Sequence, residues 1–147
     1  MIGISALLLF GLASSSLDGP GRAEPPTATS IAHCGDILAQ MHRKPPHVTF
    51  TGCRLMTEAQ GRPLRATYKV DGQYAAAVET YLVKAIGLAR LRRSCCQWDA
   101  PPRSFVDKQG RAFTLSMNSQ ETAITSRARW NRIRHFQITI ETMTEEI

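Results

Sequence analysis

Alternation of apolar and polar side chains predicts that much of the chain forms β-strands. In residues 64–70 and 136–140 every second side chain is apolar, and the side chains between them are polar. Because successive side chains of a strand point to opposite faces, this period places one face of each strand in the core and the other in solvent. Both segments are therefore predicted to be strands of an antiparallel sheet that is covered on one face.

Further strands are predicted on either side of these two. Residues 48–55 alternate in the same way until Gly52, where the buried parity shifts by one residue, as a β-bulge would produce. A turn that contains glycine, at 58–63, separates this strand from the next. The remaining predicted strands are 88–98 and a hairpin of 105–107 with 111–117 around the turn 108–110.

Two segments have the three- and four-residue spacing of amphipathic helices. Residues 31–41 follow Ser30, a suitable N-cap, and end before Pro45-Pro46, which cannot continue a helix. Residues 74–85 carry the more regular apolar stripe, and Gly87 is placed to end that helix. Residues 119–134 show no clear period, so no element is predicted there.

The expected order is helix, two strands, helix and then further strands, without an internal repeat. This order predicts the α+β class, with a mainly antiparallel sheet of about five strands and two helices packed on one face. Residues 33–147 are predicted to form one such domain, since their number is ordinary for a single domain.

The first residues predict export. Residues 2–13 are mostly apolar, too few to span a bilayer but typical of a signal peptide, and small side chains follow at 13–15 and 21–23. We expect a signal peptide at 1–23 and a short tether at 24–32; a buried N-terminal helix is the competing interpretation. The mature domain would then lie in the periplasm or outside the cell, and nothing after residue 23 is apolar enough to span a membrane.

An excess of basic side chains predicts an anionic partner. The formal net charge is +6 at pH 7, and loss of residues 1–23 would leave it unchanged, because they contain one acid, Asp18, and one base, Arg22. For an exported protein the expected partners are an anionic envelope component, such as sugars or phospholipid headgroups, or an acidic protein, rather than nucleic acid. Solubility alone is the alternative explanation of the charge.

Two groups of arginines and one tryptophan are the predicted partner-binding residues. Arginine and tryptophan dominate the energetics of many interfaces, although a core position is the alternative for the tryptophan. We expect the set to form one positive surface, because the residues around the tryptophan look too polar to be buried. The set is Arg90, Arg92, Arg93, Arg127, Arg129, Trp130, Arg132 and Arg134.

The four cysteines, Cys34, Cys53, Cys95 and Cys96, are predicted to form disulfides, because an exported chain meets an oxidising compartment. If the first helix runs antiparallel to the first strand, Cys34 and Cys53 lie at the same end, which favours a bond between them. Cys95 and Cys96 would then be a strained vicinal pair or two thiols. A crosswise pairing of both with the first two cysteines stays open, because neighbouring residues of a strand point to opposite faces.

No metal or cofactor is predicted. Adjacent cysteines, even with His33, lack the Cys-x-x-Cys spacing of structural zinc sites, and familiar redox dithiols use that spacing too. The sequence contains no Gly-rich phosphate loop, His-Glu-x-x-His or Gly-x-Ser-x-Gly motif, so no catalytic residue is nominated.

The leading hypothesis is a non-enzymatic exported binding protein. The alternatives are a small hydrolase or redox enzyme using residues such as His135, Cys95 and Asp99, and a structural envelope protein.

Three short motifs carry a resemblance to a known family. They are Cys34-Gly35-Asp36-Ile37-Leu38, Gly61-Arg62-Pro63-Leu64-Arg65-Ala66 and Cys95-Cys96-x-Trp98. With these motifs the chain resembles a family of small exported bacterial proteins classed only as a domain of unknown function. The resemblance spans most of residues 33–147. It implies a Gram-negative envelope protein without an assigned activity, and it implies no catalytic residues.

Overall fold

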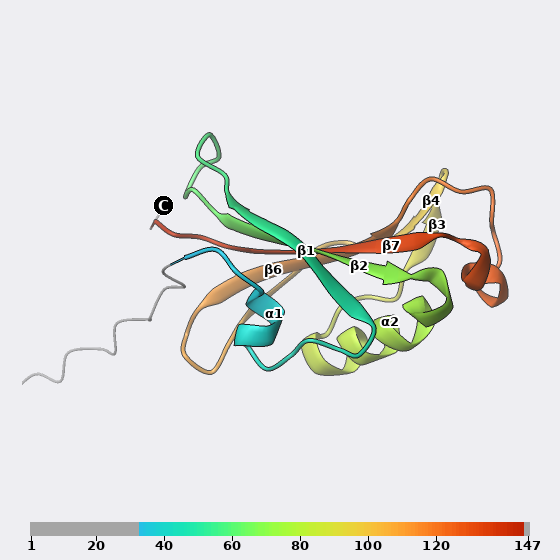
Figure 1. The fold of residues 1–147 in the computed structure, drawn as a ribbon, viewed down its shortest axis with the longest axis horizontal. Helices are drawn as coiled ribbons and strands as arrows, with labels where there is room; N and C mark the ends of the chain where they lie inside the picture. The colour runs from blue at the N-terminus through green and yellow to red at the C-terminus, as the bar shows by residue number, and fades with distance from the viewer. Residues whose placement is uncertain (1–32, 146–147) are drawn as a thin grey trace, which may run out of the picture.

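The computed structural model describes residues 33–145 (Figure 1). The elements along the chain are α1 (Ile37–Gln40), β1 (Val48–Leu55), β2 (Leu64–Asp71), α2 (Gly72–Ile86), β3 (Arg92–Ser94), β4 (Gln97–Asp99), β5 (Arg103–Val106), β6 (Ala112–Ser119), the 3-10 helix η1 (Arg127–Arg132) and β7 (His135–Thr142). Within the described range, no helix is long and apolar enough to cross a membrane. The predicted signal peptide, the tether and the cap at Ser30 lie outside the described residues.

The strands form one antiparallel sheet with the order β1-β2-β7-β6-β4-β3, and β5 pairs with β6 outside this order. The predicted α+β class is confirmed, but the sheet has seven strands instead of about five. The predicted strand 88–98 is wrong: it is two short strands, β3 and β4, joined by a turn at Cys95 and Cys96. Its first residues do not pair with the sheet because Leu88 and Leu91 pack into the core instead.

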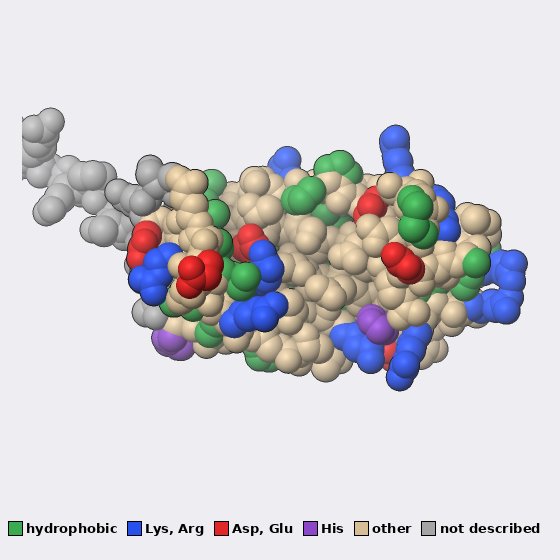
Figure 2. All heavy atoms as spheres, turned by 90° about the horizontal axis from the view of Figure 1, so that it is seen from above, with side chains coloured by type: hydrophobic (Ala, Val, Ile, Leu, Met, Phe, Trp, Pro, Cys, Tyr) green, Lys and Arg blue, Asp and Glu red, His purple; other side chains and the backbone are tan. Residues whose placement is uncertain are grey.

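One face of the sheet is apolar and covered, while the other is polar and open. In β2, β6 and β7 the buried side chains alternate with half-buried or exposed ones, as their sequences predict. Ile140 of β7 is paired with Ala66 of β2 on one side and with Leu115 of β6 on the other. The apolar side chains of the three neighbouring strands therefore share one face of the sheet. Figure 1 shows α1 and α2 on that side. Figure 2 shows the opposite side, where polar uncharged side chains and backbone occupy most of the surface.

The main covering helix is α2, and it follows the prediction closely. Its inner stripe is Ala75, Val78, Leu82 and Ile86. Gly87 ends the helix with φ +81, and the N–H of the buried Leu88 bonds back to the Leu82 carbonyl. This is the left-handed glycine cap that the sequence predicts, with the apolar contact that commonly accompanies it.

The first helix is much shorter than predicted, because its start is fixed at Asp36 rather than at Ser30. The Asp36 carboxylate accepts a hydrogen bond from the Ala39 N–H at 3.0 Å, which caps α1. The buried Tyr68 hydroxyl accepts from the Leu38 N–H at 2.9 Å and donates to Asp36 at 3.0 Å. The predicted pair of helices is therefore corrected to one main helix with short helices beside it.

Candidate functional site

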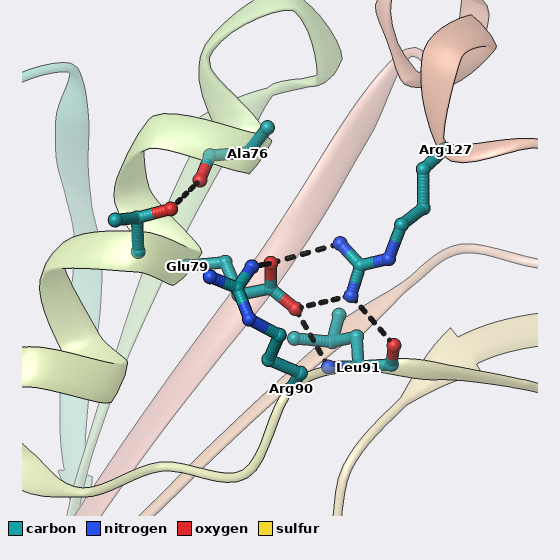
Figure 3. A network of polar contacts seen from close by, with 6 residues as sticks. Ala76, Glu79, Arg90, Leu91 and Arg127 are labelled. Atoms are coloured by element: carbon teal, nitrogen blue, oxygen red, sulfur yellow. Dashed lines mark hydrogen bonds and ion pairs between the residues drawn. The ribbon is translucent and has the colours of Figure 1, made fainter.

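A buried carboxylate joins the two arginine groups that the sequence singled out. Glu79 lies on α2 and is fully buried. It accepts two hydrogen bonds from Arg127, at 2.7 and 2.9 Å, and one from the Leu91 N–H at 2.7 Å (Figure 3). Arg90 reaches the same carboxylate at 3.3 Å from a more exposed position. The segments 90–93 and 127–134 thus meet at Glu79.

Arg127 is a structural residue rather than a free surface charge. It also donates to the Leu91 carbonyl at 2.8 Å, and its guanidinium lies 4.4 Å from the ring centroid of Trp130 and 5.7 Å from that of Trp98. Hydrogen bonding to Glu79 raises the pKa of Arg127 above its ordinary value despite the opposing effect of desolvation. A guanidinium held by a bidentate carboxylate and two aromatic rings is fixed in place.

Trp130 is buried, which is the core position that the sequence left open for it, while the other residues of η1 are exposed or half-buried. The 3-10 helix η1 turns this side chain inward, where it packs against Trp98 and Phe136 at centroid distances of 5.2 and 5.0 Å. The backbone approaches α2 closely at Gly72, where a Cβ atom would lie 2.2 Å from the Trp130 carbonyl oxygen. The tryptophan therefore belongs to the core, and the neighbouring arginines remain on the surface.

The exposed arginines of the two groups are called the arginine end below: Arg90, Arg92, Arg129, Arg132 and Arg134. Among residues 33–145, the side chains of the last four make no ion pair or hydrogen bond. Figure 2 shows basic side chains near both ends of the molecule and along its edges. That the arginine end forms one continuous binding surface stays a prediction.

Two shallow hollows adjoin the arginine end. Arg132 and Arg134 line one of about 390 Å³ together with Asp71 at the start of α2. Arg90 and Arg92 line the other, of about 370 Å³, together with Asp99. Each hollow thus contains a carboxylate beside its two arginines. The geometry suits contact with an extended anionic surface better than enclosure of a small anion.

Arg93, the remaining member of the predicted set, points into the protein. Its Nη2 donates to the Thr122 carbonyl at 2.6 Å, while its Nε and Nη1 are buried without a partner in the described part of the chain. It connects the β3–β4 hairpin to the segment that precedes η1.

The cysteines divide into one disulfide and two thiols. The predicted Cys34–Cys53 bond is present, with 5.4 Å between the two Cα atoms. Cys95 and Cys96 are free. Crosswise pairing is wrong because β1 and β3 lie at opposite edges of the sheet, so the two groups cannot meet.

The residues of the alternative enzymatic hypothesis are not assembled into a site. No hydrogen bond or ion pair among the described residues joins His135, Cys95 and Asp99. His47 stacks on Tyr74 with 3.7 Å between ring centroids, which is a packing role. In residues 33–145 no group of three or more His, Cys, Asp or Glu side chains is placed to hold a metal ion.

Sequence reasoning missed Glu79, the residue that organises the site. The sequence did indicate that Glu79 is buried, because this residue lies on the apolar stripe of the helix, four residues after Ala75 and three before Leu82. A charge at such a position predicts a buried ion pair, since an unpaired buried carboxylate is very costly.

Fold and site together define a class of protein: a one-sided antiparallel α+β domain with a basic end anchored to a buried carboxylate. The chain belongs to a family described as a domain of unknown function (DUF4952), whose model matches residues 21–98. The match includes β1, β2, α2 and the Cys95-Cys96-x-Trp98 motif and ends before β5. Comparison with curated proteins and with solved structures found no match.

Proposed function

We propose that this chain is an exported, non-enzymatic binding protein whose arginine end contacts an anionic partner, either an envelope component or an acidic protein. The observation that carries the proposal is the group of exposed arginines, Arg92, Arg129, Arg132 and Arg134, which have no acidic partner among the described residues. Elsewhere in the described chain some arginines have an acidic partner, as in the Arg111–Asp107 and Arg65–Glu141 pairs, and others, such as Arg54, have none.

Rigidity of the underlying structure supports the same proposal. Arg127 and Glu79 hold η1 against α2, so the backbone that carries the exposed arginines is ordered before any partner binds. Preorganisation of this kind reduces the entropy lost on binding. A preordered group of exposed arginines suits a polyanion, whose charges are spread over a large area.

The proposal is tested with the mature domain and three defined probes: vesicles of phosphatidylglycerol, polygalacturonate and polyglutamate. The Arg129→Glu/Arg132→Glu variant is compared with Lys84→Glu/Lys108→Glu, which changes the net charge equally at exposed sites outside the arginine end. We expect the arginine variant to lose binding to the probe that the wild-type protein prefers, and the lysine variant to retain most of it. Added salt should reproduce the loss, because exposed charges are screened within about 10 Å at 0.1 M salt.

The three probes separate the partner classes, since phospholipid, acidic sugar and acidic protein are each presented alone. Equal losses in the two variants would show that net charge, rather than the arginine end, determines binding. Absence of binding to all three probes by the wild-type protein would exclude the proposal and favour a structural role.

A further inference from the structure

The turn between β3 and β4 has unusual residues for its geometry. Ser94 pairs with Gln97, so the connection consists of Cys95 and Cys96 alone. Cys95 adopts φ +48. Two-residue hairpin turns of this kind normally place Gly, Asn or Asp at positions with positive φ, because other side chains are strained there. Strained positions occupied by reactive side chains point to chemistry at that position.

The two thiols differ in access but lie in contact. Cys95 is exposed and Cys96 is half-buried. Their side chains are close enough that the Cys96 thiol donates a hydrogen bond to the Cys95 sulfur, which raises the pKa of Cys96, with burial acting in the same direction. An exposed thiol beside a shielded one is the arrangement of an attacking thiol and a resolving thiol.

Two charged side chains near Cys96 act on its thiol in opposite directions. The charge of Arg93 lowers the pKa of Cys96, but the hydrogen bond with Cys95, burial and the charge of Glu121 raise it, and the pKa stays above its ordinary value. Two nitrogens of Arg93 are buried and have no partner among the described residues. The Cys96 carbonyl accepts from the Thr122 N–H at 2.7 Å, and Arg93 donates to the Thr122 carbonyl at 2.6 Å. The turn, the arginine and the segment leading to η1 are therefore bound together.

We propose that Cys95 and Cys96 form a redox-active dithiol whose substrate is an accessible disulfide, either of a small thiol compound or of another protein. The Cys95 thiolate attacks one sulfur of that disulfide, forms a mixed disulfide and releases the first thiolate. The Cys96 thiolate then attacks the Cys95 sulfur, closes a Cys95–Cys96 disulfide and releases the second thiolate. Two electrons pass from the dithiol to the substrate, and the two thiol protons pass through solvent to the released thiolates.

The short distance between adjacent residues makes the Cys95–Cys96 disulfide easy to reduce again. Adjacent Cα atoms are about 3.8 Å apart across a trans peptide, which is shorter than the roughly 4.4–6.8 Å that disulfides usually span. A bond closed over so short a distance is strained and easily reduced. The Cys34–Cys53 bond, with its Cα atoms 5.4 Å apart, lies within the usual range. The two cysteine pairs therefore have different roles: one structural, the other exchanging electrons.

This site goes beyond the binding function proposed above and does not depend on it. None of its chemistry uses the arginine end, so either proposal can fail without the other. It also differs from the familiar Cys-x-x-Cys dithiol, since the thiols sit at a hairpin turn rather than at a helix N-terminus.

The experiment incubates the purified full-length domain with oxidised glutathione, alkylates the remaining thiols and maps every cysteine by peptide mass spectrometry. We expect two alkylated thiols, Cys95 and Cys96, before treatment and none afterwards, with an internal bond within one peptide and the Cys34–Cys53 bond unchanged. Titration against glutathione buffers should reduce the new bond under conditions that leave Cys34–Cys53 fully oxidised.

Two single variants test the order of steps. Cys96→Ser should stop at a stable adduct of one glutathione on Cys95, and Cys95→Ser should react more slowly, since Cys96 is half-buried. Arg93→Gln should slow closure of the internal bond and let the mixed disulfide accumulate. The proposal would be overturned if both thiols stayed open to alkylation after treatment, or if each carried its own glutathione or linked two chains.

Discussion

Removal of Arg127 should destabilise the domain far more than removal of Arg90, although both arginines bond to Glu79. Arg127→Met deletes three hydrogen bonds of 2.7–2.9 Å, two of which go to a carboxylate that is fully buried. Breaking a buried ion pair by removing one partner costs about 3–5 kcal/mol, because the other charge is left uncompensated. The Arg127 side chain is 38% exposed, so water can replace part of the loss and the lower end of that range is expected.

Arg90→Met is the matched control. Its side chain is 61% exposed and makes a single contact of 3.3 Å to Glu79, so the expected cost is at most about 1 kcal/mol. Urea unfolding at pH 7, followed by tryptophan fluorescence, measures both variants, since Trp98 and Trp130 both lie beside Arg127. For a domain of this size, about 3 kcal/mol corresponds to a fall in Tm of roughly 10 °C.

A double variant isolates the buried charge as the cause. Glu79→Gln in the Arg127→Met background removes the charge but keeps an acceptor for the Leu91 N–H, so most of the lost stability should return. Equal costs for Arg127→Met and Arg90→Met would refute this reasoning. So would a double variant as unstable as Arg127→Met alone.

Two other predictions concern the backbone at α2 and the acid stability of α1. Gly72→Ala places a Cβ 2.0 Å from the Ile133 carbonyl oxygen and should lower the free energy of unfolding by about 3 kcal/mol or more. Gly110→Ala, where nothing lies within 4 Å, should lower it by about 1–2 kcal/mol because of the positive φ alone. Urea unfolding of the two variants measures the difference. Burial raises the pKa of Asp36, but hydrogen bonds, first among them that of Lys44, outweigh this and hold the pKa below its ordinary value of 3.8. The stabilisation by Asp36 is therefore complete above that value and is lost as the pH falls below it, so the stability difference between wild type and Asp36→Asn should shrink between pH 5 and pH 2. A difference that stays constant over this range would contradict the assignment.

Elements defined by a local period were predictable from the sequence. The strands β2, β6 and β7 and the helix α2 follow their alternating or helical patterns, and the register shift between Phe50 and Gly52 confirms the predicted bulge. The end of α2 at Gly87 was equally readable, since left-handed backbone favours glycine. Local signals sufficed because these segments bury one complete face.

The site depended on contacts between distant segments, which a local period does not encode. Burial of Trp130 requires η1 to pack on α2 at Gly72, 58 positions earlier in the chain. The turn at Cys95 was missed because its positive φ is occupied by a residue that rarely takes it. The arginines were found by their type alone, and only the structure separates Arg127, which is bonded to Glu79, from Arg129, whose side chain bonds to none of the described residues.

Strict alternation in the central strands also protects the chain before it folds. Segments that aggregate combine several consecutive apolar residues with low charge. In β2 the charged residues Arg65 and Lys69 interrupt the apolar series, and in β6 and β7 Thr, Ser, Gln and Glu do so. The same polar side chains that form the open face thus separate the apolar ones along the unfolded chain. A newly made chain therefore exposes no long apolar run in these strands.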